Sequence, residues 1–194
     1  MNPRGIEVVA IGQSATYART VTDDDIARYA DLSGDDHPQH VDAAWARKTR
    51  FGGRIAHGAL LVGYMSAAST RWVRRWLEGR TTQSTVSYGY DRIRFVKPVF
   101  PGDTIEVTHE VDTIDTSSGK FVAAVTARNQ DGVVVAAPEA DDEAALLLER
   151  GAEGDELADF VAGDDDAVGG VRHGGGVFAA AAYLAFDGGQ EDFH

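Results

Sequence analysis

Apolar side chains recur every three to four positions between residues 57 and 77. This spacing places them along one face of an α-helix. Gly58 and Gly63 keep the helix slim, so that another surface can approach it closely. We therefore predict one long, largely buried helix. Its apolar stripe consists of Leu61, Met65, Ala68, Trp72 and Trp76, widened by Leu60 and Tyr64.

The segment before this helix combines a strand pattern with a capped helix start. Residues 15–21 alternate between apolar and polar side chains, which is typical of a strand. Thr22 and Asp25 form a capping-box pattern, which predicts a short helix that begins there. Residues 35–53 are expected to form a loop with one short helix over residues 42–49.

After residue 80 the pattern changes to the two-residue period of β-strands. Ile105, Val107, His109 and Val111 alternate with polar residues and therefore face one side of a sheet. A strand and helices followed by antiparallel strands indicate an α+β protein in which one curved sheet wraps around the central helix. The expected strands cover residues 81–100, 104–115, 121–130 and 133–137.

Charge is distributed unevenly along the chain. Residues 1–138 contain 16 acidic residues and 16 lysines and arginines, whereas residues 139–194 contain 15 acidic residues and two arginines. The net charge of −13 therefore belongs to the C-terminal part, which is also rich in Gly, Ala and Asp. Such a composition buries little apolar surface. We expect a folded domain over residues 1–149 and a mobile acidic tail over residues 150–194, in which residues 177–186 can dock as a local helix.

The composition also excludes several classes of protein. The chain has no cysteine, which excludes disulfides, thiolate chemistry and cysteine-ligated zinc. An acidic chain lacks the basic surface that nucleic acids require. The N-terminus lacks the apolar run of a signal peptide, and the longest apolar run is too short to cross a bilayer. We therefore expect a cytoplasmic protein that binds neither nucleic acid nor a membrane.

Two pairs of residues carry candidate chemistry. Asp35 and His40 flank Pro38 in the predicted loop, and a bend there directs a carboxylate and an imidazole into one cleft as a general acid–base pair. The alternative is that both side chains only cap turns. His57 and Gly58 precede the long helix, whose first N–H groups and dipole suit a developing oxyanion. The alternative for Gly58 is close packing alone.

A metal site is a further alternative for this region. His37, His40, His57 and Asp35 are all residue types that ligate zinc. None of these residues shows the regular spacing of a motif such as HExxH. We therefore expect no metal.

Two separated stretches resemble one known family. Residues 33–61, SGDDHPQHVDAAWARKTRFGGRIAHGALL, resemble the signature of MaoC-like dehydratases and (R)-specific enoyl-CoA hydratases, S-G-D-x-N-P-[IL]-H-x-D followed by F-x-x-x-I-[AV]-H-G-M-L. Residues 93–107, IRFVKPVFPGDTIEV, are similar to the family's second stretch, F-x-x-P-V-x-x-G-D-T. The resemblance covers residues 22–135 and does not include the tail.

The resemblance implies a hot-dog fold, a bent antiparallel sheet around a long central helix, in a homodimer or higher homo-oligomer. Asp35 and His40 match the catalytic aspartate and histidine. Gly58 matches the glycine whose N–H polarises the thioester carbonyl, and His57 stands beside it in the substrate-binding position. The implied reaction is reversible hydration of a trans-2-enoyl-CoA to an (R)-3-hydroxyacyl-CoA in fatty-acid or hydroxyalkanoate metabolism. No cofactor is implied, because coenzyme A belongs to the acyl-CoA substrate.

Two departures from the family pattern matter for the site. His37 replaces an asparagine that supports the loop, and Gly63 replaces a small polar residue, which weakens a supporting hydrogen bond or widens the pocket. Arg92, Arg94 and Lys97 are either phosphate contacts for coenzyme A or ordinary surface residues. Two other functions stay open: a hot-dog acyl-CoA thioesterase, and a non-catalytic acyl-CoA-binding protein that uses the acidic tail as its interaction element.

Overall fold

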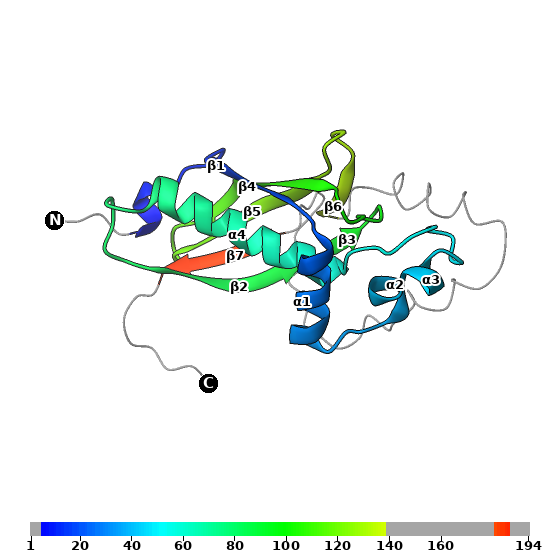
Figure 1. The fold of residues 1–194 in the computed structure, drawn as a ribbon. Coiled ribbons are helices and arrows are strands. Elements are labelled where there is room, and N and C mark those ends of the chain that lie inside the picture. The colour runs from blue at the N-terminus through cyan, green and yellow to red at the C-terminus, as the bar shows by residue number, and fades with distance from the viewer. Residues whose placement is uncertain (1–4, 139–180, 187–194) are drawn as a thin grey trace, which may run out of the picture.

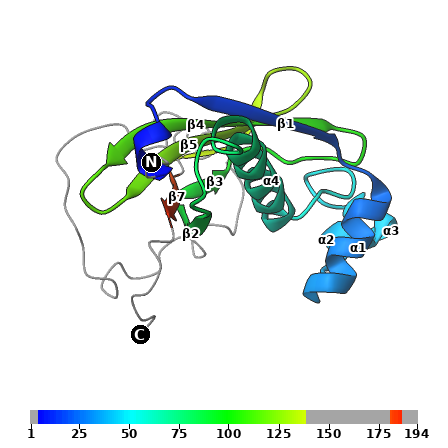
Figure 2. The same cartoon turned by 90° about the vertical axis from the view of Figure 1, so that its left-hand side faces the viewer.

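A long helix lies against one face of a curved antiparallel sheet in the computed structural model, which describes residues 5–138 and 181–186 (Figure 1). A view from the side shows the sheet arching over helix α4, with α1, α2 and α3 gathered beyond one end of it (Figure 2). The helices are α1 (Asp23–Ser33), α2 (Pro38–Val41), α3 (Ala43–Ala46) and α4 (Gly58–Trp76), preceded by a 3-10 turn over Gly5–Val8. The strands are β1 (Ser14–Thr20), β2 (Thr85–Asp91), β3 (Ile93–Phe95), β4 (Thr104–Asp115), β5 (Lys120–Arg128), β6 (Val134–Pro138) and β7 (Ala181–Phe186).

The sheet has seven strands, with β1, β4, β5, β6 and β3 following one another across it. Strand β5 pairs with β4 along one edge, and its other edge is shared by two strands. Strand β7 pairs with residues 120–124 of β5, and β6 pairs with residues 127–128. Strands β6 and β7 therefore fill one strand position end to end. Strands β3 and β2 continue outward from them and form an edge of the sheet.

The core lies between α4 and the sheet. Leu61, Met65 and Trp72 of α4 are buried, as the apolar stripe predicts. Ile105, Val107, His109 and Val111 are buried together on one face of β4, which confirms the predicted alternation. The indole nitrogens of Trp72 and Trp76 donate to the Gln13 and Ser14 carbonyls at 3.0 and 2.9 Å, which fix the far end of α4 to the chain leading into β1.

The α+β prediction is confirmed, and the expected strands match β1, β4, β5 and β6 closely. Residues 81–100 instead form two short strands, β2 and β3, and the expected loop holds a second short helix, α2, before α3. The C-terminal segment differs from the expectation, because residues 181–186 form strand β7 rather than part of a local helix. The predicted boundary after residue 149, and the mobile acidic tail apart from β7, lie outside the described residues and stay predictions. No helix of the described residues is long and apolar enough to cross a membrane.

Candidate active site

The loop that carries Asp35 begins where α1 ends. Gly34 adopts a left-handed conformation with φ of 78° and donates its N–H to the Ala30 carbonyl, which closes the helix. The Ser33 hydroxyl then accepts a hydrogen bond from the Asp35 N–H at 3.2 Å. This sharp exit places the Asp35 carboxylate on the surface side of the loop, where it is exposed.

Helix α2 is a single turn that carries His40 inward. Its N-cap is His37, whose Nδ1 accepts from the Gln39 N–H at 3.3 Å, and Pro38 occupies the first turn, where no N–H is needed. His40 lies at the end of this turn and is only 5% exposed. The sequence therefore folds locally so that one turn separates the exposed Asp35 from the buried His40.

Hydrogen bonds fix the orientation of the His40 ring. Nδ1 lies 2.8 Å from the Ile55 carbonyl oxygen, which only a protonated nitrogen can satisfy. In the neutral ring Nε2 is then the bare nitrogen, and it lies 3.0 Å from the side-chain nitrogen of Gln39, from which it accepts. Burial lowers the pKa of His40, although the hydrogen bond to Ile55 opposes that effect. His40 is therefore a neutral proton acceptor at neutral pH.

His57 packs directly on His40. The two rings stack with their centroids 3.8 Å apart, and Tyr29 covers His57 from another side at 4.8 Å. His57 Nε2 lies 2.9 Å from the backbone carbonyl oxygen of Asp35 and donates to it, which ties the start of α4 to the loop after α1. His57 is 1% exposed, and no hydrogen-bond partner for its Nδ1 lies in the part of the chain that the structure describes.

Asp35, His40 and His57 converge in space. One carboxylate oxygen and one nitrogen from each ring all lie within 4.8 Å of one another. The sequence predicts that Asp35 and His40 face one cleft and that His57 stands beside Gly58. The structure brings all three side chains together. A carboxylate and a neutral imidazole at this separation can hold a water molecule between them and move its proton.

Gly58 is the first residue of α4, directly after this cluster. Its N–H has no intrahelical acceptor at that position, and no side chain of the described residues caps the helix start. A Cβ at residue 58 would lie 2.6 Å from the ring of Phe95, which is closer than real side chains approach. A side chain at residue 58 would therefore displace the half-exposed Phe95 ring, and the N–H remains available to a negatively charged oxygen.

A family model described as "MaoC like domain" matches residues 8–132. The chain belongs to the MaoC-like domain family. The (R)-specific enoyl-CoA hydratase of Rhodospirillum rubrum is 36% identical over 134 residues, which are 69% of this chain and 87% of that protein. The 3-hydroxybutyryl-CoA dehydratase of Methylorubrum extorquens is 29% identical over 78% of this chain and 88% of that protein.

Solved structures of the MaoC-like family have the same fold. An R-hydratase of Pseudomonas aeruginosa, in its unliganded form, is 32% identical and superimposes with a TM-score of 0.58 over 68% of this chain and 79% of its own. The (R)-hydratase of Aeromonas caviae involved in PHA biosynthesis is 26% identical, with a TM-score of 0.57 over 66% of this chain and 91% of its own. The fold is therefore the hot-dog fold that the sequence predicts.

The two departures from the MaoC-like pattern lie in different surroundings. His37 takes over a supporting role in the loop, because it caps α2 and its ring lies 5.4 Å from Trp45. Gly63 is exposed, and a Cβ there would meet nothing within 4 Å. Within the described part of the chain, Gly63 therefore faces solvent and not the cluster.

Sequence reasoning missed three residues of this MaoC-like site. Gln39 contacts the bare nitrogen of His40, the Ile55 carbonyl fixes the tautomer of His40, and Phe95 covers Gly58. Gln39 had a visible signal, because it stands where the family pattern has isoleucine or leucine. The roles of Ile55 and Phe95 depend on tertiary contacts and leave no local pattern.

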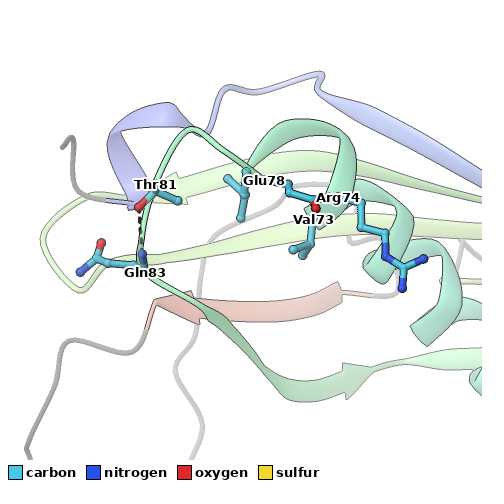
Figure 3. A pocket seen from close by; sticks show the side chains of 6 residues that line it. Val73, Arg74, Glu78, Thr81 and Gln83 are labelled. Carbon is cyan, nitrogen blue, oxygen red and sulfur yellow. Dashed lines mark hydrogen bonds between the residues drawn. The ribbon is translucent and has the colours of Figure 1, made fainter.

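A cavity of about 240 Å³ lies elsewhere, at the C-terminal end of α4 (Figure 3). Val73, Arg74 and Glu78 line it together with Leu77, Thr81 and Gln83. At 1.5 Å per helical residue, Val73 is about 22 Å along α4 from Gly58. This cavity is therefore separate from the cluster of Asp35, His40 and His57.

Proposed function

We propose that this chain catalyses the reversible addition of water to a trans-2-enoyl-CoA, which gives an (R)-3-hydroxyacyl-CoA. The convergence of the Asp35 carboxylate with the buried, neutral His40 carries the proposal. The names of the hydratase and dehydratase relatives support the same reaction. Coenzyme A enters as part of the substrate, and the reaction needs no further cofactor.

Asp35 and His40 hold the reacting water in the proposed mechanism. The water oxygen bonds to C3 of the enoyl group while the pair takes up the proton that the water loses. A proton from the pair then goes to C2, so the pair ends in its starting protonation state. The hydrogen bond from Nδ1 of His40 to the Ile55 carbonyl supports this role, because it leaves Nε2 as the acceptor.

Gly58 stabilises the charge that develops on the thioester oxygen. As the water oxygen bonds to C3, the electron pair of the C2=C3 double bond shifts toward the carbonyl and places negative charge on the thioester oxygen, which gives an enolate. The free N–H of Gly58 and the positive end of the α4 dipole favour this charge. His57 contacts both members of the acid–base pair and directly precedes Gly58. It therefore fixes the position of the start of α4 relative to Asp35 and His40.

An assay with crotonyl-CoA tests the proposal. We expect the absorbance of the conjugated thioester to fall and the product to be (R)-3-hydroxybutyryl-CoA by chiral chromatography, with no free thiol released. Release of free coenzyme A without hydration would instead support the thioesterase alternative. Binding of acyl-CoA without turnover would support the non-catalytic alternative, and formation of the (S)-product would contradict the stereochemistry.

We further propose that the chain acts as a homodimer. Strand β2 lies at an edge of the described sheet, and it presents Val86 and Tyr88, which are 48% and 61% exposed. An edge strand with apolar side chains readily pairs with another chain. Location in the cytoplasm stays a prediction from the sequence.

The molecular mass in solution tests the dimer. We expect sedimentation equilibrium to give twice the 20.7 kDa of one chain. Replacing Val86 and Tyr88 together with lysine is expected to give a monomer. Ile11→Lys is the matched control, because Ile11 is 69% exposed in a turn away from that edge. A monomeric wild-type protein would contradict the proposal.

A further inference from the structure

The buried nitrogen of His57 lacks the partner that such a group normally has. Among residues 5–138 and 181–186 its Nδ1 finds no hydrogen-bond partner, His57 is only 1% exposed, and its other nitrogen is well bonded. Buried polar atoms are nearly always satisfied, so an exception indicates strain, a function or an unseen ligand. Because Nε2 donates to the Asp35 carbonyl, Nδ1 of the neutral ring carries a lone pair. Such a lone pair is satisfied by a hydrogen-bond donor or by a cation.

His40 has the same electronic arrangement. Its Nδ1–H is held by the Ile55 carbonyl at 2.8 Å, which leaves a lone pair on Nε2. Histidines that ligate metals almost always donate their second N–H to a carbonyl or carboxylate, which fixes the ring and increases its basicity. Both histidines of the cluster therefore have the surroundings of metal ligands, each through a backbone carbonyl.

Asp35 supplies a third ligand, a carboxylate whose negative charge attracts a metal cation. Its side chain is exposed, and among residues 5–138 and 181–186 no donor is found on its carboxylate oxygens. The three ligand atoms lie within 4.8 Å of one another. Zinc–ligand bonds of about 2.1 Å in a tetrahedron require ligand separations of about 3.4 Å. Metal binding therefore requires the exposed Asp35 side chain to rotate. It also requires the two rings, now stacked at an interplanar angle of 25°, to open until both lone pairs point at one ion.

We propose that Asp35, His40 and His57 bind one divalent transition-metal ion of the zinc class, and that the bound ion inhibits the enzyme. Two neutral imidazoles and one carboxylate form a donor set that suits such ions. The inhibition rests on the proposed hydration reaction, because the ion takes the lone pair of His40 and the carboxylate of Asp35 that the reacting water needs. The ion is thus a regulator or poison of the site and not its cofactor.

Gln39 competes with an ion for the lone pair of His40. Its side-chain amide contacts Nε2 of His40 and must withdraw before a metal binds there. We expect Gln39→Leu to bind the ion more tightly than the wild-type protein, since that competing hydrogen bond is lost. Asp35→Asn and His40→Gln are expected to weaken binding about tenfold or more, because each removes one ligand.

Calorimetric titration of the metal-free, full-length protein with zinc chloride tests the site. We expect one equivalent to bind with ligand nitrogens from His40 and His57, identified by their ¹⁵N chemical shifts. The absence of cysteine removes competing thiolate sites. His109→Leu is the matched control, because that histidine packs against Trp72 and lies outside the cluster. Circular dichroism verifies that each variant is folded, and the shifts of the wild-type rings report ligation without any variant.

Two readouts separate this inference from the proposed function. Zinc binding that is unchanged in Asp35→Asn, or that leaves both ring nitrogens unshifted, would overturn the metal site even if the protein hydrates crotonyl-CoA. Zinc binding by the three residues in a protein with no hydratase activity would retain the metal site and reject the hydration reaction. With both intact, zinc is expected to abolish hydration, and a chelator is expected to restore it.

Discussion

Gly58 combines two requirements in one residue. The Phe95 ring leaves no room for a side chain, and the N–H at the helix start is placed for the thioester oxygen. We expect Gly58→Ala to displace Phe95 or the start of α4 and to reduce crotonyl-CoA hydration at least tenfold through lost oxyanion stabilisation. Steady-state kinetics measure the effect.

Gly63→Ala is the matched control on the same helix. A Cβ at residue 63 meets nothing within 4 Å, so the variant is expected to keep its activity and to gain up to about 1 kcal/mol from helix propensity. Equal loss of activity in both variants would contradict the special position of Gly58.

The central residues of the site were predictable from the sequence because they lie in two short stretches. Asp35 and His40 flank one proline, and His57 precedes the glycine that begins the apolar helix. The hydrogen bond from His57 to the Asp35 carbonyl joins residues 22 positions apart, and no local sequence pattern predicts it. The tautomer of His40 likewise depends on Ile55, a backbone acceptor supplied by a different loop.

At the scale of elements, α2 is the turn that aims His40 into the protein. Its cap is a histidine side chain, and removal of an N-cap costs about 1 kcal/mol in typical helices. We expect His37→Asn to retain both stability and activity, since asparagine also caps helices. His37→Ala is expected to lower the unfolding free energy by about 1 kcal/mol and to lower kcat, because the loop that holds Asp35 and His40 loosens.

Chemical denaturation and steady-state kinetics of these two variants check the role of the cap. If His37→Ala behaves as the wild-type protein in both measurements, the hydrogen bond from the Gln39 N–H contributes nothing, and α2 is held only by the burial of His40.

Most elements were predictable because their patterns are local. The alternation along β4 and the capping box of α1 are each complete within a few residues. Strand β7 was not predictable, because residues 181–186 are alanine-rich and their strand state depends on pairing with the distant β5 and β2. Strand propensity is a matter of surroundings more than of sequence.

At the scale of the whole molecule, His109 ties folding to pH. It is fully buried beneath the Trp72 ring, and neither ring nitrogen has a hydrogen-bond partner among the described residues. Burial lowers the pKa of His109 to about 4, from 6.5 in an unfolded chain. The stability that depends on the neutral ring is complete above pH 6.5 and is lost progressively as the pH falls toward 4, by roughly 3 kcal/mol in total.

Urea denaturation at several pH values measures this effect. His109→Leu fills a similar volume with an apolar side chain that does not titrate. The stability of this variant relative to the wild-type protein is therefore expected to increase as the pH falls from 6.5 to 4 and to stay constant above that window. A difference between the two proteins that does not change with pH would show that His109 does not titrate on unfolding.

The central claim is that Asp35 and His40 act on one water molecule as a unit. Kinetics of crotonyl-CoA hydration by Asp35→Asn, His40→Ala and the double variant test it most directly. Each single variant is expected to lose kcat by about 10²- to 10⁴-fold, and the double variant is expected to lose little more, because residues that act together are not additive. Full activity in either single variant, or independent multiplicative losses in the double variant, would contradict the account.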